Sequence, residues 1–153
     1  MATVGLESSP RGQPSTRPNS ESCLIFFDPQ AHTGRGVPLG ALMDGLERID
    51  HGNRALEDKA LVARLREDRI PLTVCPLSNL ELRVVEDRKA HSIKRMLDLG
   101  LLATVNSDDP AYFGGYINEN FRQVANAVGL SIEDIAALAR NSLEASFTDH
   151  PRF

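Results

Sequence analysis

The stretch Leu101-Leu-Ala-Thr-Val-Asn-Ser-Asp-Asp-Pro110 decides the fold, because an apolar segment runs directly into a cluster of polar side chains. Residues 101–105 are apolar except for one threonine, which is typical of a strand that is covered on both faces. Two adjacent carboxylates, Asp108 and Asp109, follow the strand. In parallel α/β folds the groups that carry chemistry gather at the carboxyl ends of the strands. The stretch therefore predicts one strand of a parallel sheet with a candidate active site at its end.

The same pattern occurs twice upstream. Residues 47–50 form a short strand candidate that ends at His51-Gly52-Asn53. Residues 71–75 form another, which Pro76 stops, and they run into the cluster Cys75-Pro-Leu-Ser-Asn79. A further apolar run, 23–27, also has the composition of a strand.

Helical segments are predicted between and after these strands. They cover residues 56–68, 90–99 and 118–128, and a last helix is capped by Ser131 with Glu133 and Asp134 in its first turn. Short strands that alternate with helices indicate βαβ units and a parallel sheet, so the fold class is α/β. A closed (β/α)8 barrel typically needs ~250 residues, so a chain of 153 residues supplies only part of one.

The composition argues against several classes of partner. Hydrophobic residues make up 41% and charged residues 25% of the chain, as in a soluble globular protein. A net charge of −4 without a basic stripe argues against nucleic acid as a partner. No apolar run reaches the ~18 residues of a membrane span. The two cysteines, Cys23 and Cys75, fit a reducing compartment, so we expect a cytoplasmic or nuclear protein.

Several side chains are candidates for chemistry, and each has a plainer interpretation. Along an extended segment Asp108 and Asp109 would point to opposite sides, one toward a metal and the other toward a substrate, but Asp-Asp-Pro is also ordinary turn sequence. His51 can orient a metal-bound hydroxide or act as a general base, or it can simply be hydrogen-bonded. His32 suits zinc at a strand end, although its glycine-rich surroundings equally fit a mobile loop.

Three other side chains are expected to play no chemical part. Cys75 is predicted to be a buried strand thiol. His91 and His150 are predicted to lie at the surface.

Three motifs carry a resemblance to a known family. Residues 47–52 (Glu-Arg-Ile-Asp-His-Gly), 72–79 and 105–116 resemble three successive strand-end motifs of the adenosine/adenine deaminase family, in the family's order. Residues 141–147 resemble its closing helix. The resemblance implies a partial (β/α)8 barrel of the TIM type, holding roughly the last three or four strand–helix units. It also favours the chemical interpretation of Asp108-Asp109 over the turn. Residues 46–153 would be the C-terminal part of the deaminase barrel, 23–45 a degraded strand–loop region, and 1–22 a Pro- and Ser-rich loop or disordered segment.

The resemblance also implies a reaction and residue roles. The cofactor would be one zinc ion with Asp108 as a ligand. His51 would orient and help to deprotonate the water that zinc activates, and Asp109 would hydrogen-bond a purine ring nitrogen. The reaction would be hydrolytic deamination at C6 of a purine. Adenine to hypoxanthine is preferred, because residues 107–116 look closer to the adenine-acting branch, and adenosine to inosine is the alternative.

The chain departs from the family in its metal ligands. The family's first strand carries a His-x-His zinc pair, and the 153 residues contain no such pair. The nearest match to the motif of the third zinc histidine is His32-Thr-Gly-Arg-Gly36, in which Arg35 stands where the family has a proton-donating glutamate. Arginine stays protonated and cannot replace that acid.

Two hypotheses follow from this departure. The chain is either part of a working deaminase or a non-catalytic remnant of one. In both cases we expect no turnover from the 153 residues alone, and self-association through exposed sheet edges.

Overall fold

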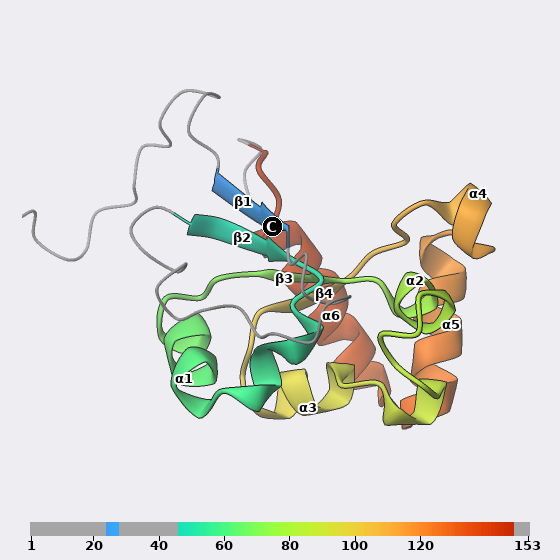
Figure 1. Ribbon diagram of the computed structural model, residues 1–153, viewed down its shortest axis with the longest axis horizontal. Helices are drawn as coiled ribbons and strands as arrows, with labels where there is room; N and C mark the ends of the chain where they lie inside the picture. Colours follow the sequence, from blue (N-terminus) through green and yellow to red (C-terminus); the bar gives the residue numbers. More distant parts are fainter. Residues whose placement is uncertain (1–23, 28–45, 149–153) are drawn as a thin grey trace, which may run out of the picture.

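Four parallel strands form one sheet in the computed structural model, which describes residues 24–27 and 46–148 (Figure 1). The strands pair in the order of the sequence, β1-β2-β3-β4. Their bounds are β1 Leu24–Phe27, β2 Leu46–Asp50, β3 Leu72–Val74 and β4 Ala103–Val105. All four predicted strands are confirmed. The segment predicted to be a loop, 1–22, lies outside the described residues, as does His32.

The order of the strands distinguishes between two kinds of α/β fold. In an open doubly wound sheet the strand order reverses at a switch point, whereas in a (β/α)8 barrel each strand pairs with the next one along the chain. Here Ile49 is paired with Leu72, and Thr73 is paired with Thr104, so consecutive strands are neighbours throughout. The sheet is therefore a consecutive arc of barrel strands, and the α/β class is confirmed.

Helices fill the connections after β2, β3 and β4, and α6 runs along the sheet beside β4 (Figure 1). The α-helices are α1 Lys59–Glu67, α2 Pro76–Glu81, α3 Ile93–Asp98, α4 Pro110–Phe113, α5 Ile117–Val128 and α6 Ile132–Glu144, with short 3-10 helices η3 Asn53–Glu57 and η4 Arg88–Ala90. The cap predicted for the last helix is present, since Ser131 and Asp134 form a reciprocal capping box. No helix within the described residues has the length and apolar character to cross a membrane.

Several helices differ from the sequence prediction, since α4 was not predicted and α3 is shorter than the predicted 90–99, and for two others the local reason is clear. The helix predicted over 56–68 is divided at Asp58, whose side chain accepts hydrogen bonds from the backbone N–H groups of Ala60 and Leu61 and so begins α1. The helix α2 was not predicted. Pro76 stops β3, as expected, but proline is also favoured at the first helical position, and here it begins α2 at once.

The core lies between the sheet and the helices. Its residues are apolar and almost fully buried, and most of them come from three strands and four α-helices: Ile49, Leu72, Val74, Ala103 and Val105 from the strands, and Leu61, Leu65, Ile93, Met96, Val124 and Leu138 from the helices. Deleting such a side chain typically costs about 2–5 kcal/mol. The carboxyl ends of the strands are fixed to one another by this core.

The outer edge of β4 meets a side chain of α6. The backbone of β4 pairs with β3 through Leu102 and Asn106, because Leu102 O accepts from Leu72 N and Asn106 N donates to Val74 O. The carbonyl of Ala103 instead accepts a hydrogen bond of 2.8 Å from Asn141 Nδ2. One edge carbonyl is thereby occupied without a further strand.

Candidate active site

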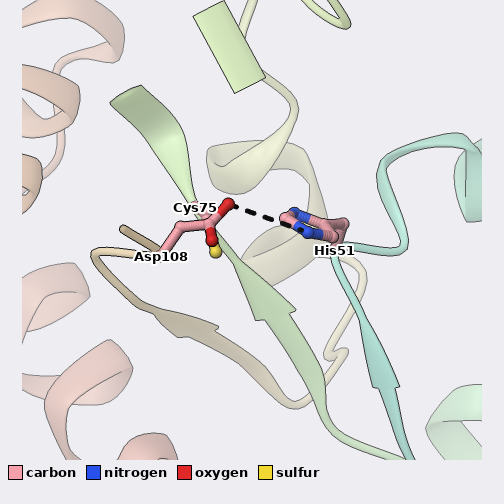
Figure 2. A group of neighbouring side chains, drawn as sticks. All are labelled: His51, Cys75 and Asp108. Carbon is pink, nitrogen blue, oxygen red and sulfur yellow. Dashed lines mark ion pairs between the residues drawn. The ribbon is translucent and has the colours of Figure 1, made fainter. Parts of the chain in front are cut away.

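Three strand ends place three chemically different side chains next to one another. His51 follows β2, Cys75 follows β3, and Asp108 comes shortly after β4 (Figure 2). The parallel pairing continues to this point, since His51 N donates to Thr73 O at 3.1 Å. The carboxyl ends of neighbouring parallel strands lie along one edge of the sheet, which is why residues far apart in the sequence meet here.

The side chains converge closely. His51 Nε2 lies 4.0 Å from Asp108 Oδ2, and one ligand atom from each of His51, Cys75 and Asp108 lies within 4.8 Å of the others. The His51 side chain is 12% exposed and that of Asp108 is 33% exposed, while Cys75 is buried. Nitrogen, sulfur and carboxylate oxygen are all zinc donors, so the residues present fit a zinc ion by their chemistry. Asp108 offers the group its most accessible donor.

Two of these residues have backbone conformations that are unfavourable for side-chain-bearing residues. The φ angle is 66° at His51 and 57° at Asp108, both in the left-handed region. This conformation costs roughly 1–2 kcal/mol for an L-amino acid other than glycine, although aspartate and histidine tolerate it better than most. Backbone strain of this kind concentrates at functional sites, where it aims a side chain.

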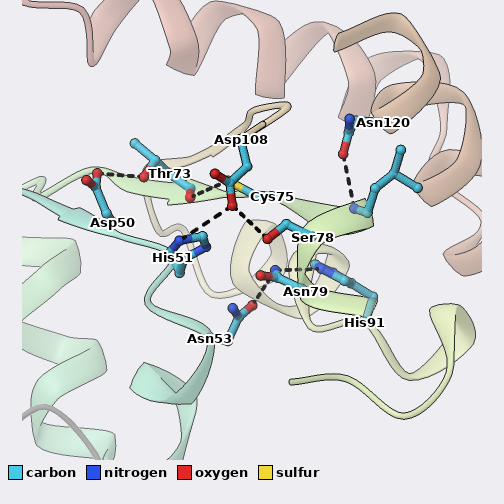
Figure 3. A network of polar contacts seen from close by, with 11 residues as sticks. Asp50, His51, Asn53, Thr73, Cys75, Ser78, Asn79, His91, Asp108 and Asn120 are labelled. Atoms are coloured by element: carbon cyan, nitrogen blue, oxygen red, sulfur yellow. Dashed lines mark hydrogen bonds and ion pairs between the residues drawn. The ribbon is translucent and has the colours of Figure 1, made fainter. Parts of the chain in front are cut away.

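Helix α2 supports the carboxylate of Asp108 from below (Figure 3). Ser78, which is fully buried, donates a hydrogen bond of 2.7 Å to Asp108 Oδ2. Helix α2 is in turn held by Asn120 of α5, whose Oδ1 accepts from Leu77 N at 3.1 Å. The orientation of Asp108 therefore depends on two packed helices and not only on its own loop.

The thiol of Cys75 is strongly disposed to stay protonated in the metal-free chain. Burial, together with the negative charges of Asp108 and Asp50, raises the pKa of Cys75 to about 12, against a smaller lowering by a backbone hydrogen bond at Asp108. Sγ also donates weakly to Thr73 O at 3.5 Å. Without a cation beside it, Cys75 is therefore a poor nucleophile.

Asp109 has a different set of partners from Asp108. Its Oδ1 accepts from Ala111 N and Tyr112 N, so that Asp109 caps α4, and the residue is exposed. The two adjacent carboxylates thus have different partners, and the backbone at Asp108 is left-handed and not extended as predicted. His51 and Asp108 are brought together, whereas none of the contacts described joins Asp109 to them.

A buried histidine lies next to this site and corrects the sequence prediction. His91 was predicted to lie at the surface, but it is only 7% exposed. Its Nδ1 accepts from Ile93 N at 3.2 Å, and its Nε2 lies 3.4 Å from Asn79 Nδ2 (Figure 3). Asn79 is also buried and donates to Asn53 Oδ1 at 3.0 Å. Burial lowers the pKa of His91 to about 4, so the ring is neutral near neutral pH.

Sequence reasoning placed Cys75 and Ser78 in a polar strand-end cluster but gave neither a part in the site. The burial predicted for Cys75 is confirmed, yet its approach to His51 and Asp108 depends on the register of three strands. The signal that pointed to both residues was their position immediately after β3.

A hollow in the described part of the chain lies to one side of these groups. It has a volume of about 430 Å³ and is lined by Asn53, Arg54, Glu57, Arg83, Val84, Val85, Glu86, Ala90 and Ser92. His51, Asp108 and Asp109 do not line it. We therefore do not assign the hollow to a purine.

The arc of consecutive parallel strands, with His51 and Asp108 at its carboxyl edge, is the architecture of a (β/α)8 barrel whose candidate chemical groups lie at the carboxyl ends of its strands. The chain belongs to the adenosine deaminase family, because the model of that family, described as adenosine deaminase, matches residues 40–152.

Curated relatives are similar over almost the whole chain. An adenine deaminase from Caulobacter vibrioides (strain NA1000 / CB15N) is 52% identical over 155 residues, covering 96% of this chain and 45% of that protein. An adenine deaminase from Sphingopyxis alaskensis is 50% identical, covering 96% of this chain and 46% of that protein. The chain thus spans about half the length of the curated relatives it matches.

Solved structures share the fold. The crystal structure of adenine deaminase from Arthrobacter aurescens superposes with a TM-score of 0.69 at 47% identity, covering 72% of this chain and 34% of that one. An amidohydrolase from Burkholderia ambifaria with bound zinc gives a TM-score of 0.62 at 27% identity, covering 68% of this chain and 29% of that one. The prediction of a partial (β/α)8 barrel from the deaminase family is confirmed.

Proposed function

We propose that this chain carries one side of an adenine deaminase active site, and that the reaction is the zinc-dependent hydrolysis of adenine to hypoxanthine and ammonia. The observation that carries the proposal is the approach of His51 Nε2 to Asp108 Oδ2, at 4.0 Å, at the carboxyl ends of β2 and β4, which flank β3 in a deaminase-family barrel. Adenine is preferred to adenosine because relatives about 50% identical to the chain are named adenine deaminases.

The roles follow from what each group can do. Zinc, when bound, would supply a water acidic enough to lose its proton near neutral pH. Asp108 would hold the ion through its carboxylate, which Ser78 orients. His51, next to this carboxylate, would orient the attacking water and accept its proton at Nε2.

Asp109 would face the purine and hydrogen-bond a ring nitrogen. Its carboxylate is exposed, and one oxygen is already engaged at the start of α4, which fixes the direction of the side chain. A substrate would therefore meet a carboxylate that needs little reorganisation. The acid that protonates the ring would have to come from elsewhere, because Arg35 cannot supply it.

The test is a chimera with a relative. Residues 46–153 replace the matching segment of the Caulobacter vibrioides adenine deaminase, and the formation of hypoxanthine and ammonia is measured with adenine and with adenosine. We expect the chimera to deaminate adenine faster than adenosine, and the 153-residue chain with added zinc to show no turnover. A folded, zinc-loaded chimera without activity would instead identify the chain as a non-catalytic remnant.

Matched variants of the chimera separate the roles. Asp108→Asn and His51→Gln should each lower kcat, by at least the ~10²–10⁴-fold that general acid–base help is typically worth. Asp109→Asn should chiefly raise KM for adenine while zinc remains bound. Loss of zinc from the Asp109→Asn variant would contradict the roles assigned to Asp108 and Asp109. An Asp108→Asn variant that keeps both its zinc and its full kcat would contradict them as well.

A further inference from the structure

We propose that Asn79 is a positioning residue for the reaction. It holds the loop that carries His51, as its neighbour Ser78 holds Asp108, so that helix α2 sets the spacing of the two groups (Figure 3). The inference rests on the proposed function and extends it, because it adds a residue that would touch neither zinc nor substrate.

The loop after β2 needs a restraint because its backbone is strained. His51 and Gly52 are both left-handed, with φ angles of 66° and 60°. This conformation is unfavourable for His51, which has a Cβ, and such strain persists only where the surrounding contacts over-determine it. The His51 N–H donates to Thr73 O at 3.1 Å, which fixes the loop where it leaves the sheet. A further restraint beyond Gly52 would hold the imidazole in place from the other side.

Asn79 supplies that further restraint. Asn53, two residues after His51, has its Oδ1 atom 3.0 Å from Asn79 Nδ2, so a contact between two amides joins the loop to α2. Asn79 is itself fixed, since it is only 1% exposed and its backbone carbonyl accepts from the N–H groups of Val84 and Val85. A buried and fixed amide can therefore hold the loop without much movement of its own.

His91 determines which atom Asn79 presents to the loop. Nδ1 of His91 accepts from Ile93 N–H at 3.2 Å, so the neutral ring carries its proton on Nε2, which lies 3.4 Å from the Asn79 amide. This proton needs an oxygen. When Asn53 and Asn79 both turn by half a turn, the oxygen and nitrogen of each amide exchange places and the contact of 3.0 Å is kept. The oxygen of Asn79 then accepts from both His91 Nε2 and Asn53 Nδ2.

This arrangement of the amides also satisfies a buried donor. In the orientation drawn in Figure 3, Asn53 Nδ2 is buried and has no hydrogen-bond partner within the described part of the chain. A buried N–H group without a partner costs free energy, and the oxygen of Asn79 would provide one. The Asn53 donor and the protonated Nε2 of His91 thus favour the same role for Asn79, which is that of an acceptor between them.

The deaminase chimera tests the positioning role, because a general loss of stability would not separate turnover from zinc binding. Asn79→Ala should lower kcat for adenine by roughly 10–100-fold and leave KM and zinc content little changed, since Ser78 still holds Asp108. Ser78→Ala, one residue away on α2, should instead weaken zinc binding. Asn79→Asp retains an oxygen at this position and should recover most of kcat.

Asn141→Ala is the matched control. It removes another asparagine side chain and its hydrogen bond, which is made to Ala103 O away from the loop, so it should leave kcat unchanged. Far-ultraviolet circular dichroism establishes that each variant is folded.

A double-mutant cycle shows whether Asn79 acts through Asn53. Asn53→Ala removes the same contact from the half-buried side of the loop, and it serves as the test where Asn79→Ala does not fold. The two substitutions together should lower kcat no more than either one alone, because residues that act through one contact are not additive. Effects on kcat that multiply, an unchanged kcat, or loss of zinc from Asn79→Ala would overturn the proposal.

A measurement without turnover keeps the proposal separate from the proposed function. In the full 153-residue chain, ¹H–¹⁵N NMR of the histidine rings should show His91 protonated at Nε2. Asn79→Ala should shift the His51 ring and Gly52 amide signals more than the backbone signals of Asp108. A His91 ring protonated at Nδ1, or His51 signals that do not respond, would overturn the proposal. An inactive chimera with the expected NMR changes would support the restraint and contradict the proposed function alone.

Discussion

The buried imidazole of His91 should make the stability of this fold depend on pH. The ring is 7% exposed, and burial lowers its pKa to about 4, from the ordinary histidine value of 6.5. Its Nδ1 accepts from Ile93 N–H, so a proton added there would face another donor. The folded chain therefore excludes a proton that the unfolded chain binds readily.

The sign and size of the pH dependence of stability follow from the folded-state pKa of about 4 and the ordinary value of 6.5. Between pH 6.5 and about 4 the unfolded state binds more protons, so the free energy of unfolding falls as the pH falls. Each pKa unit corresponds to about 1.4 kcal/mol. The His91 contribution to stability should thus decline by about 2 kcal/mol between about pH 7 and about pH 5, and by about 3 kcal/mol by about pH 4.

Urea denaturation of the wild type and of His91→Gln over this pH range measures the effect. The variant cannot titrate at this position, so the difference between the two unfolding free energies should shrink as the pH falls from about 7 to about 4 and level off only at lower pH. An NMR titration of the histidine ring protons gives the pKa directly. Parallel pH profiles for the two proteins, or a His91 that titrates near 6.5 in the folded chain, would refute the reasoning.

Two further substitutions test the packing behind the site. Asn120→Ala should lower the free energy of unfolding in urea by about 2–4 kcal/mol, because it leaves a buried backbone N–H of α2 without an acceptor. Asn126→Ala, on the exposed face of α5, the helix that also carries Asn120, should be close to neutral. Equal effects of the two substitutions would contradict this. Gly52→Ala should cost about 1–3 kcal/mol in thermal or urea unfolding, since φ is 60° and the new Cβ would lie 2.7 Å from Leu72 Cδ2. Gly129→Ala has a similar φ with no atom within 4 Å, so it should cost only about 1 kcal/mol, and a cost as large as that of Gly52→Ala would show that the clash is unimportant.

Two of the strands could be predicted from the sequence because residues 71–75 and 101–105 are short apolar runs that stop at a polar cluster. Residues 47–50 are mostly charged, and the cluster His51-Gly52-Asn53 after them was the stronger signal for this strand. The helix boundaries were harder to predict from the sequence. Whether a proline ends a strand or begins a helix depends on how the residues after it pack in the folded chain, and Pro76 does both.

The candidate site was only partly predictable. His51 and Asp108 could be identified because both follow strands. The distance between their side chains depends on how the strands are aligned, and this register cannot be read from any one segment of the sequence. The burial of His91 depends on its contact with Asn79 and on the packing around the ring. The sequence shows only a polar residue at the start of a predicted helix, which is typical of a surface position. The placement of His32 lies outside the described residues.

The left-handed backbone at His51 and Asp108 has a consequence for how this sequence changes over generations. Glycine would relieve roughly 1–2 kcal/mol of conformational cost at each position, so folding alone favours replacement there. A lineage freed from the need for an imidazole and a carboxylate would drift toward glycine or asparagine at both sites. The identity of these two residues in gene copies from related strains therefore records whether purifying selection still acts on the chemistry.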